Sequence, residues 1–239
     1  MTESSAKASS DFECQRGDAL TLQPFVVHIW LSHRQCFANS DLFKRTVLSR
    51  YAPVQPSDWR FESGVHGKPA LVDPPVPLTF NVSHSRERLA CAVALDLPLG
   101  VDLEYRHPDR ELMRVARRYF QREEVKVLES LPEQSKRDHF YDLWTLKESA
   151  VKARGEALPT GLGSRGFAIL QTAGVDRIHT AGAIQADERF WLFDLDSEYR
   201  LSLCALSQEI SAVDFFHYTT QAVPLQLVPR AASADTQDS

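Results

Sequence analysis

The stretch LACAVALDLPLGVDLE, residues 89–104, decides the fold of this chain of 239 residues. Its first part, 89–95, is apolar at every position, which is typical of a strand that is covered on both faces. A short turn then leads into 100–104, which carries Asp102 and Glu104. Because side chains on a strand alternate with period two, both carboxylates lie on the same face. The stretch therefore predicts a buried strand followed by an extended segment that holds two acidic groups close together.

Helical and extended patterns alternate on both sides of this stretch. Before it, 25–31 (FVVHIWL) is rich in β-branched and aromatic residues and predicts a strand, and Ser40 is placed to cap a helix over 40–51. The proline-rich region that follows, through FNVSHS at 80–85, is expected to form loops. The expected elements after Glu104 are helices over 109–120, 123–131 and 137–154, the last ending at Gly155, and strands over 166–170, 190–195, 200–206 and 213–217.

The order strand, helix, strands occurs once before Asp102 and once after it. The segment LSLCAL at 201–206 also resembles the apolar strand at 89–95. We therefore expect an α+β fold with two similar lobes that meet near Asp102. The expected ranges are a polar, disordered tail over 1–20, a first lobe over 21–101, a second lobe over 102–229, and a second disordered tail over 230–239.

The composition is that of an ordinary globular protein, with 43% hydrophobic and 25% charged residues. A formal net charge of −5 argues against a surface made for general nucleic-acid binding. The cysteines are scattered and lack the spacing of metal ligands, so we expect no zinc site, and their pattern fits a reducing compartment. We found neither a signal-peptide pattern nor an apolar run of the ~20 residues that a membrane span needs, so we expect a cytoplasmic protein. The four cysteines are Cys14, Cys36, Cys91 and Cys204.

The segment WTLKESAVK, 144–152, lies in the longest expected helix and carries a third carboxylate. Glu148 and Lys152 are four residues apart, so they share a helix face, and a surface ion pair worth ~0.3–0.5 kcal/mol is one interpretation. Trp144 lies one turn earlier on the same face, and apolar residues bury most of the rest of the helix. Three carboxylates make an oxygen ligand set suited to Mg²⁺, and nearby lysines indicate a phosphate substrate. Lys147 is expected to reach a different phosphate oxygen.

Three further groups of residues have both a structural and a functional interpretation. Ser83 and His84 are either structural or part of an anion site, since no serine nucleophile pattern accompanies them. Lys68, in Gly-Lys-Pro at 67–69, does not belong to a phosphate-binding loop of the P-loop spacing, but a lysine on a rigid turn can hold a phosphate. The basic residues after the Asp-x-Glu pair form either a solvated helix face or a docking patch for an acidic protein; they are Arg114, Arg117, Arg118 and Lys126.

Taken in order, GKP (67–69), FNVSHS (80–85), GVDLE (100–104) and WTLKESAVK (144–152) resemble the 4′-phosphopantetheinyl transferases. The resemblance is to the larger, surfactin-synthetase-associated type, to which the chain length also corresponds. It implies a monomer of two similar α+β lobes with pseudo-twofold symmetry and coenzyme A in the cleft between them. It further implies transfer of the phosphopantetheine arm to a serine of an apo carrier protein, with release of 3′,5′-ADP.

The resemblance also implies roles for individual residues. Lys152 corresponds to a lysine near the transferred phosphate. From the chemistry of the reaction, Glu148 is the first candidate for the base that takes the serine proton, directly or through a water on the metal. Lys152 is the second candidate if its pKa is depressed, but its neighbours are anionic, so it is preferred as the residue that stabilises charge. The helices over 109–120 and 123–131 are the expected carrier-docking surface. The implied Mg²⁺ ligands are Asp102, Glu104 and Glu148, and the implied contacts to the nucleotide part of coenzyme A are Lys68, Ser83, His84 and Arg45, with His33, Arg34 or Lys44 as alternatives to the last.

Two other functions stay open at this level. A Mg²⁺-dependent nuclease or phosphodiesterase also uses clustered carboxylates and a lysine, and incubation with DNA or RNA tests for it. A module that binds coenzyme A or a carrier without turnover is the second alternative, and the intact set of acids and Lys152 argues against it. The sequence leaves open whether the carrier belongs to fatty-acid, polyketide or peptide synthesis.

Overall fold

The computed structural model describes residues 20–64, 66–108, 111–170, 176–182, 187–218 and 222–233. Of the two predicted tails, residues 1–19 and 234–239 lie outside these ranges. Residues 231–233 form a short strand, β13 (Ala231–Ser233), where the sequence predicted a disordered tail, so the prediction is wrong for these residues. Within the described part of the chain, no helix is both long and apolar enough to cross a membrane.

The first sheet has five strands in the order β12-β11-β1-β5-β4. Its central strand β1 pairs in parallel with β11 and antiparallel with β5. Helix α1 (Ser40–Leu48) covers its outer face with Phe43 and Val47, and its N-cap is Asn39, whose side chain accepts a hydrogen bond from Leu42 N, and not the expected Ser40. The strand bounds are β1 (Val26–His33), β4 (Leu78–Ser85), β5 (Arg88–Leu95), β11 (Ala212–Tyr218) and β12 (Ala222–Leu225).

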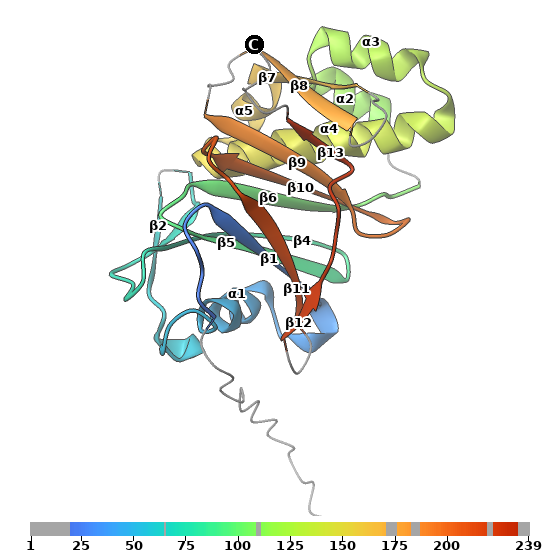
Figure 1. Ribbon diagram of the computed structural model, residues 1–239. Helices are drawn as coiled ribbons and strands as arrows, with labels where there is room; N and C mark the ends of the chain where they lie inside the picture. Colours follow the sequence, from blue (N-terminus) through green and yellow to red (C-terminus); the bar gives the residue numbers. More distant parts are fainter. Residues whose placement is uncertain are drawn as a thin grey trace, which may run out of the picture.

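The second sheet has six strands in the order β6-β10-β9-β13-β8-β7. Four helices gather on its outer face, and the longest of them, α4, packs against β6 and β10 (Figure 1). The strand bounds are β6 (Leu99–Tyr105), β7 (Arg165–Leu170), β8 (Asp176–Gly182), β9 (Glu188–Asp194) and β10 (Tyr199–Leu206). The helices are α2 (Leu112–Tyr119), α3 (Arg122–Ser130), α4 (Glu133–Arg154) and α5 (Leu158–Ser164), and a small separate hairpin is made by β2 (Phe61–Ser63) and β3 (Pro69–Leu71).

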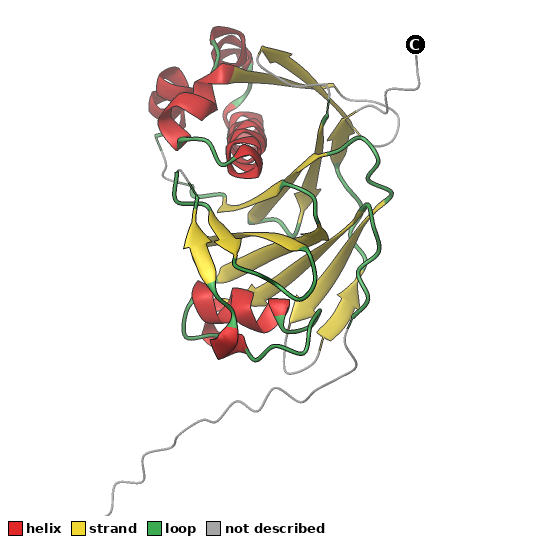
Figure 2. Cartoon of the chain, turned by 90° about the vertical axis from the view of Figure 1, so that its left-hand side faces the viewer, coloured by secondary structure: helices red, strands yellow, loops and turns green. Residues whose placement is uncertain are grey.

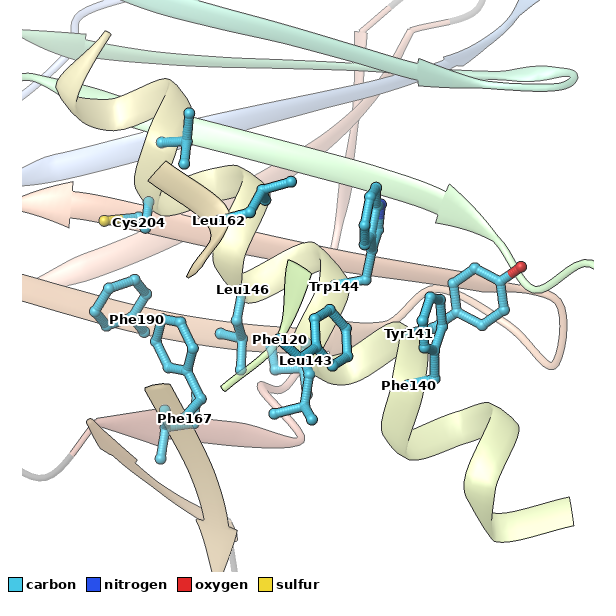
Figure 3. Close-up of a cluster of buried hydrophobic side chains, with 14 of the residues drawn as sticks. Phe120, Phe140, Tyr141, Leu143, Trp144, Leu146, Leu162, Phe167, Phe190 and Cys204 are labelled. Carbon is cyan, nitrogen blue, oxygen red and sulfur yellow. The ribbon is translucent and has the colours of Figure 1, made fainter. Parts of the chain in front are cut away.

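Three hydrophobic cores hold these layers together. The middle core lies between the two sheets, where Ile29 and Ala92 of the first meet Val101 and Leu203 of the second. The other two cores lie under α1 and under α4, so the chain forms a helix–sheet–sheet–helix arrangement (Figure 2). In the core under α4, aromatic side chains from several elements meet (Figure 3); they include Phe120, Phe140, Trp144, Phe167 and Phe190.

Both halves of the chain use the same strand order. In the first sheet β5 lies between β1 and β4, and in the second β10 lies between β6 and β9, with antiparallel pairing throughout. The two apolar segments that resemble each other in sequence are therefore β5 and β10, the middle strands of the matching groups β1-β5-β4 and β6-β10-β9. The predicted lobe boundary at 101/102 falls inside β6, and β11 and β12 return to the first sheet, so the sheets do not divide at that point of the chain.

The segment 80–85 is strand and not loop, which corrects the sequence-based expectation. In β4, Phe80 and Val82 face the core under α1, while the alternate polar side chains face β6. Three of them accept the backbone N–H groups of β6: Asn81 from Val101 at 2.9 Å, Ser83 from Leu103 at 3.1 Å, and Ser85 from Tyr105 at 3.0 Å. We call this row of contacts, made by Asn81, Ser83 and Ser85, the β4–β6 seam. It joins the edges of the two sheets through side chains.

Gly100 lets α4 approach the second sheet closely. It lies on β6, two residues before Asp102 and on the same face of the strand. A Cβ atom at this position would overlap the carbonyl oxygen of Ser149 and the amide nitrogen of Ala153, both on the α4 backbone. The absence of a side chain at Gly100 therefore sets the distance between the strand that carries two of the acids and the helix that carries the third.

Candidate active site

Side chains from three elements meet beside the β4–β6 seam. The Lys152 ammonium on α4 donates to Asp102 Oδ1 on β6 at 2.5 Å and to Ser83 Oγ on β4 at 3.2 Å. The Ser83 hydroxyl also donates to Asp102 Oδ1 at 3.0 Å. Glu148 lies one helical turn before Lys152, with Oε2 3.6 Å from Nζ. The structure thus brings together four residues that the sequence analysis had selected.

Glu104 belongs to the same group of side chains and is held by two neutral donors. The indole nitrogen of Trp144 donates to Oε1 at 3.1 Å, and the hydroxyl of Ser85 donates to Oε2 at 3.2 Å. Neither Trp144 nor Ser85 was assigned a role in the site from the sequence. For Ser85 a signal was present, because it follows Ser83 by two residues and so lies on the same face of an extended segment.

The environment of this group shifts the pKa values of Glu148 and Lys152. Burial and the neighbouring carboxylate of Asp102 raise the pKa of Glu148 to about 8. Burial alone would lower the pKa of Lys152, but the carboxylates of Asp102 and Glu148 outweigh it and raise the pKa. Lys152 therefore stays an ammonium ion, and the group as a whole holds more negative charge than one lysine neutralises, which is the situation that a bound cation relieves.

One oxygen in this group is suited to a cation ligand. Asp102 is only 2% exposed, and its Oδ2 is buried without a hydrogen-bond partner, whereas Oδ1 accepts from Ser83 and Lys152. An all-oxygen set of this kind matches the preference of Mg²⁺. Among the residues that the structure describes, no three His, Cys, Asp or Glu side chains already stand in an arrangement that would hold a metal ion. The Lys152 ammonium lies between Asp102 and Glu148, so it would have to move for all three acids to act as ligands.

Lys68 is held in a different way from that expected of a phosphate-binding lysine. Its ammonium donates to the carbonyl oxygens of Leu99 and Ala153, both at 2.9 Å. Its aliphatic stem passes Gly155, the left-handed residue at which α4 ends as predicted. Lys68 therefore ties the loop before β3 to the start of β6 and to the last turn of α4. Its contact with the nucleotide stays a prediction.

Lys68 gives a testable pH dependence of stability. Burial lowers its pKa from 10.5 to about 8. Between these values the unfolded chain holds the proton and the folded chain does not, so the free energy of unfolding should rise with pH from about 8 to 10.5. We expect the difference in unfolding free energy between the wild type and Lys68→Met to grow across this range. Urea denaturation at several pH values measures it, and a flat difference would contradict the assignment.

Lys147 does not reach the site, and that prediction is wrong. Its ammonium is buried, forms an ion pair with Glu124 at 2.8 Å, and donates to the carbonyl oxygens of Leu162 and Arg165. The physical reason is helical geometry, because neighbouring residues on a helix point about 100° apart. Glu148 faces β6, and Lys147 consequently faces the core between α4, α3 and α5.

Arg45 and His84 lie apart from the acidic group. Arg45 donates to Asp41 and to the carbonyl oxygens of Pro56 and Trp59, so it fastens α1 to the following loop. His84 is exposed and, by strand alternation, lies on the opposite face of β4 from Ser83. Their expected contacts with coenzyme A remain predictions.

The basic residues after β6 are exposed on neighbouring helices. Arg114 pairs with Glu111 at 3.0 Å, and Arg117 pairs with Glu129 at 2.9 Å. Val127, which follows the exposed Lys126 on α3, is an exposed apolar side chain. The patch, made by Arg114, Arg117, Arg118 and Lys126, therefore combines exposed basic side chains, two of them paired with glutamates, with some apolar surface.

Comparison with known proteins bears on this site. A family model described as the 4′-phosphopantetheinyl transferase superfamily matches residues 98–204, which include Asp102, Glu148 and Lys152. The 4′-phosphopantetheinyl transferase HetI of Nostoc is 37% identical, over 53% of this chain and 54% of HetI. The 4′-phosphopantetheinyl transferase Sfp of Bacillus subtilis is 30% identical, over 69% of this chain and 71% of Sfp. A second Bacillus subtilis relative, the 4′-phosphopantetheinyl transferase ffp, is 31% identical over the same shares of both chains.

The chain thus spans about half the length of HetI and more than two thirds of Sfp and ffp. A crystal structure of Thermotoga maritima holo-[acyl-carrier-protein] synthase is similar with a TM-score of 0.32 and 18% identity, over 46% of this chain and 64% of that one, which is too low to support a conclusion about the fold. The matches to Sfp and ffp extend well beyond the site. On this ground, the chain belongs to the 4′-phosphopantetheinyl transferase superfamily.

Proposed function

We propose that this protein transfers the 4′-phosphopantetheine arm of coenzyme A to a serine of apo carrier proteins and releases 3′,5′-ADP. The observation that carries the proposal is the meeting of Asp102, Glu148 and Lys152 at one point, in the part of the chain that matches the family model. A phosphoryl transfer needs mainly positioning and charge neutralisation, and this group of side chains is suited to supply both.

Asp102, Glu104 and Glu148 are the residues that we propose to hold Mg²⁺. When bound, Mg²⁺ would act as a Lewis acid and a template for the pyrophosphate oxygens. Support comes from the orphaned Oδ2 of Asp102 and from the burial and neighbouring carboxylates that together raise the pKa of Glu148. The hydrogen bond from Ser83 to Oδ1 orients Asp102 so that Oδ2 is left for this purpose.

Lys152 and Glu148 take different parts in the proposed reaction. The raised pKa of Lys152 keeps its ammonium charged, which suits it to offset negative charge that develops on the transferred phosphate and rules against a role as base. The environment of Glu148 makes its carboxylate hold a proton more strongly than a free carboxylate does. Glu148 is therefore the residue that we propose to take the proton of the attacking serine.

The decisive experiment is mass spectrometry of an apo carrier protein after incubation with the purified chain, coenzyme A and Mg²⁺. A gain of about 340 Da, the mass of the arm in this reaction class, is the expected result. An unchanged carrier mass across fatty-acid, polyketide and peptide-synthetase carriers would contradict the proposal. The same preparation incubated with DNA or RNA tests the alternative of a nuclease.

We propose that the basic patch on α2 and α3 receives the carrier, since carriers of this kind are typically acidic. Reversing the charge in Arg117→Glu and Arg118→Glu should raise KM for the carrier and leave KM for coenzyme A unchanged, because rim charges act mainly on encounter. Arg60→Glu, at an exposed position before β2, serves as a control with the same change of charge. A carrier KM that stays the same in both patch variants would remove this surface from consideration.

We further propose that the two halves of the fold are related by pseudo-twofold symmetry, with the site in the cleft between them. The matching strand orders β1-β5-β4 and β6-β10-β9 support this arrangement. In this proposal the chain acts as a monomer, because both halves needed for one site come from a single chain. We also propose a cytoplasmic location, which the free cysteines Cys36, Cys91 and Cys204 support.

A further inference from the structure

We propose that Trp144 and Ser85 are positioning residues that hold the Glu104 carboxylate in the orientation needed for cation binding. The inference rests on the proposed function, because it assigns Glu104 to the Mg²⁺ site. It extends that function by naming two side chains that orient a metal-ligating residue, Glu104, without contacting the substrate.

The geometry at Glu104 fixes both of its oxygens. Oε1 accepts from the indole N–H of Trp144 at 3.1 Å, and Oε2 accepts from the hydroxyl of Ser85 at 3.2 Å. Each carboxylate oxygen has two lone pairs, so a carboxylate oxygen can accept a hydrogen bond and also ligate a cation. A glutamate has one more rotatable bond than an aspartate, and two donors from different elements remove that freedom.

The direction of the Trp144 N–H is set by aromatic packing. Its ring stacks on Phe140 with centroids 6.0 Å apart at an interplanar angle of 12°, and it contacts Phe120 at 6.3 Å and Tyr119 at 6.1 Å. Figure 3 shows Trp144 on α4 next to Phe120 and Phe140. With only 8% of its surface exposed, the indole has little room to turn. The core under α4 thus orients a donor toward the site.

The direction of the Ser85 O–H is set by the β4–β6 seam. Its oxygen accepts the N–H of Tyr105 at 3.0 Å, so its own proton is left to point at Glu104. Ser83 repeats this arrangement two residues earlier, accepting from Leu103 and donating to Asp102. The first sheet therefore supplies one hydroxyl donor to each carboxylate of the Asp-x-Glu pair.

Hydrogen-bond donors to a residue that ligates a metal have a measurable effect on metal binding. Loss of one such partner typically lowers metal affinity 10–100-fold, because the ligand must be ordered again when the ion binds. Trp144→Phe keeps the ring in the aromatic stack and removes the N–H. Ser85→Ala removes the hydroxyl, and Ser85→Thr restores it.

The test measures Mn²⁺ binding by electron paramagnetic resonance and the Mg²⁺ dependence of arm transfer. For Trp144→Phe and Ser85→Ala we expect the Mn²⁺ dissociation constant and the Mg²⁺ activation constant to rise about tenfold or more, with kcat largely recovered at saturating Mg²⁺. Ser85→Thr should bind Mn²⁺ like the wild type. Phe167→Leu is the packing control, because it disturbs the same core at its contact with Phe190 without removing a donor to Glu104, and it should lower stability alone.

Unchanged Mn²⁺ affinity in both Trp144→Phe and Ser85→Ala would overturn the inference and leave these side chains with a packing role. A failure of the proposed function gives a different result, namely a wild-type protein that modifies no carrier. In that case the Mn²⁺ measurements on the variants still decide whether Glu104 is held for cation binding.

Discussion

Glu148→Gln should lower kcat for arm transfer by about 10²–10⁴-fold, the range that a positioned general base contributes. Glutamine has the shape of a protonated glutamate, but it cannot accept a proton and is a poor ligand for a hard cation. The fold should persist. Because burial and Asp102 raise the pKa of Glu148 to about 8, the ion-free protein already carries this side chain largely in its protonated form at pH 7. Single-turnover transfer to an apo carrier, followed by mass spectrometry, measures the loss.

The matched control for this variant is Glu133→Gln, the same substitution on the same helix. Glu133 lies in the first turn of α4 and its side chain is 78% exposed. Glu133→Gln should leave kcat unchanged. For Glu148→Gln, the unfolding free energy should change by no more than about 1 kcal/mol, the scale of one hydrogen bond. A near-normal kcat in Glu148→Gln would show that the acid on α4 takes no part in the reaction.

Gly100→Ala is the second change with a large expected effect, and it acts first on stability. The added Cβ would overlap backbone atoms of Ser149 and Ala153, which cannot rotate out of the way as a side chain can. We expect the free energy of unfolding to fall by about 3 kcal/mol, at the upper end of the range for overpacking. Displacing α4 would also separate Lys152 from Asp102, and a shift of ~1 Å in such a site can cost about 100-fold in rate.

Urea denaturation and kcat, measured on the same preparation of Gly100→Ala, test this prediction. Gly163→Ala on α5 is the control, because a Cβ there would lie 3.7 Å from the nearest atom. The control should match the wild type in both measurements. An unfolding midpoint for Gly100→Ala that also equals the wild-type value would mean that α4 does not depend on close approach at this position.

The elements with strong apolar patterns could be predicted from the sequence. The strand expected at 89–95 is β5 (Arg88–Leu95), and the helix expected at 137–154 is α4 (Glu133–Arg154), which ends at Gly155 with φ 64°. In these segments burial on one or both faces dictates the residue types. The pattern of apolar residues alone was therefore enough to predict these two elements.

The strand β4 was missed because its polar side chains have partners that lie on another sheet. Its sequence alternates between apolar Leu78, Phe80 and Val82 and polar residues that reach β6, and this period of two is the signal that identifies it. The prolines before it favoured a loop. The pairing of β11 with β1 in the first sheet could not be predicted from residue patterns, because no local pattern shows which strand will be the neighbour of another.

Some residues of the candidate site could likewise be predicted from the sequence, and others could not. The Asp-x-Glu pair and the i, i+4 pair of Glu148 and Lys152 were predictable from spacing, because each pair lies within one element. The choice between Lys147 and Lys152 needed the packing of α4, which buries the first against Glu124. Spacing placed Ser85 on the same face as Ser83, but the contacts that Ser85 and Trp144 make with Glu104 depend on how β4 and α4 pack against β6.

The parallel pairing of β1 with β11 has a consequence for biosynthesis. Residues 26–31 lie beside 212–217, so during translation β1 is made long before its partner β11. Pairings between segments so far apart close slowly, and domains that depend on them fold late during synthesis. The edge of β1 stays open on the ribosome until that late segment emerges, and chaperones that shield exposed strands should increase the yield of the protein in cells.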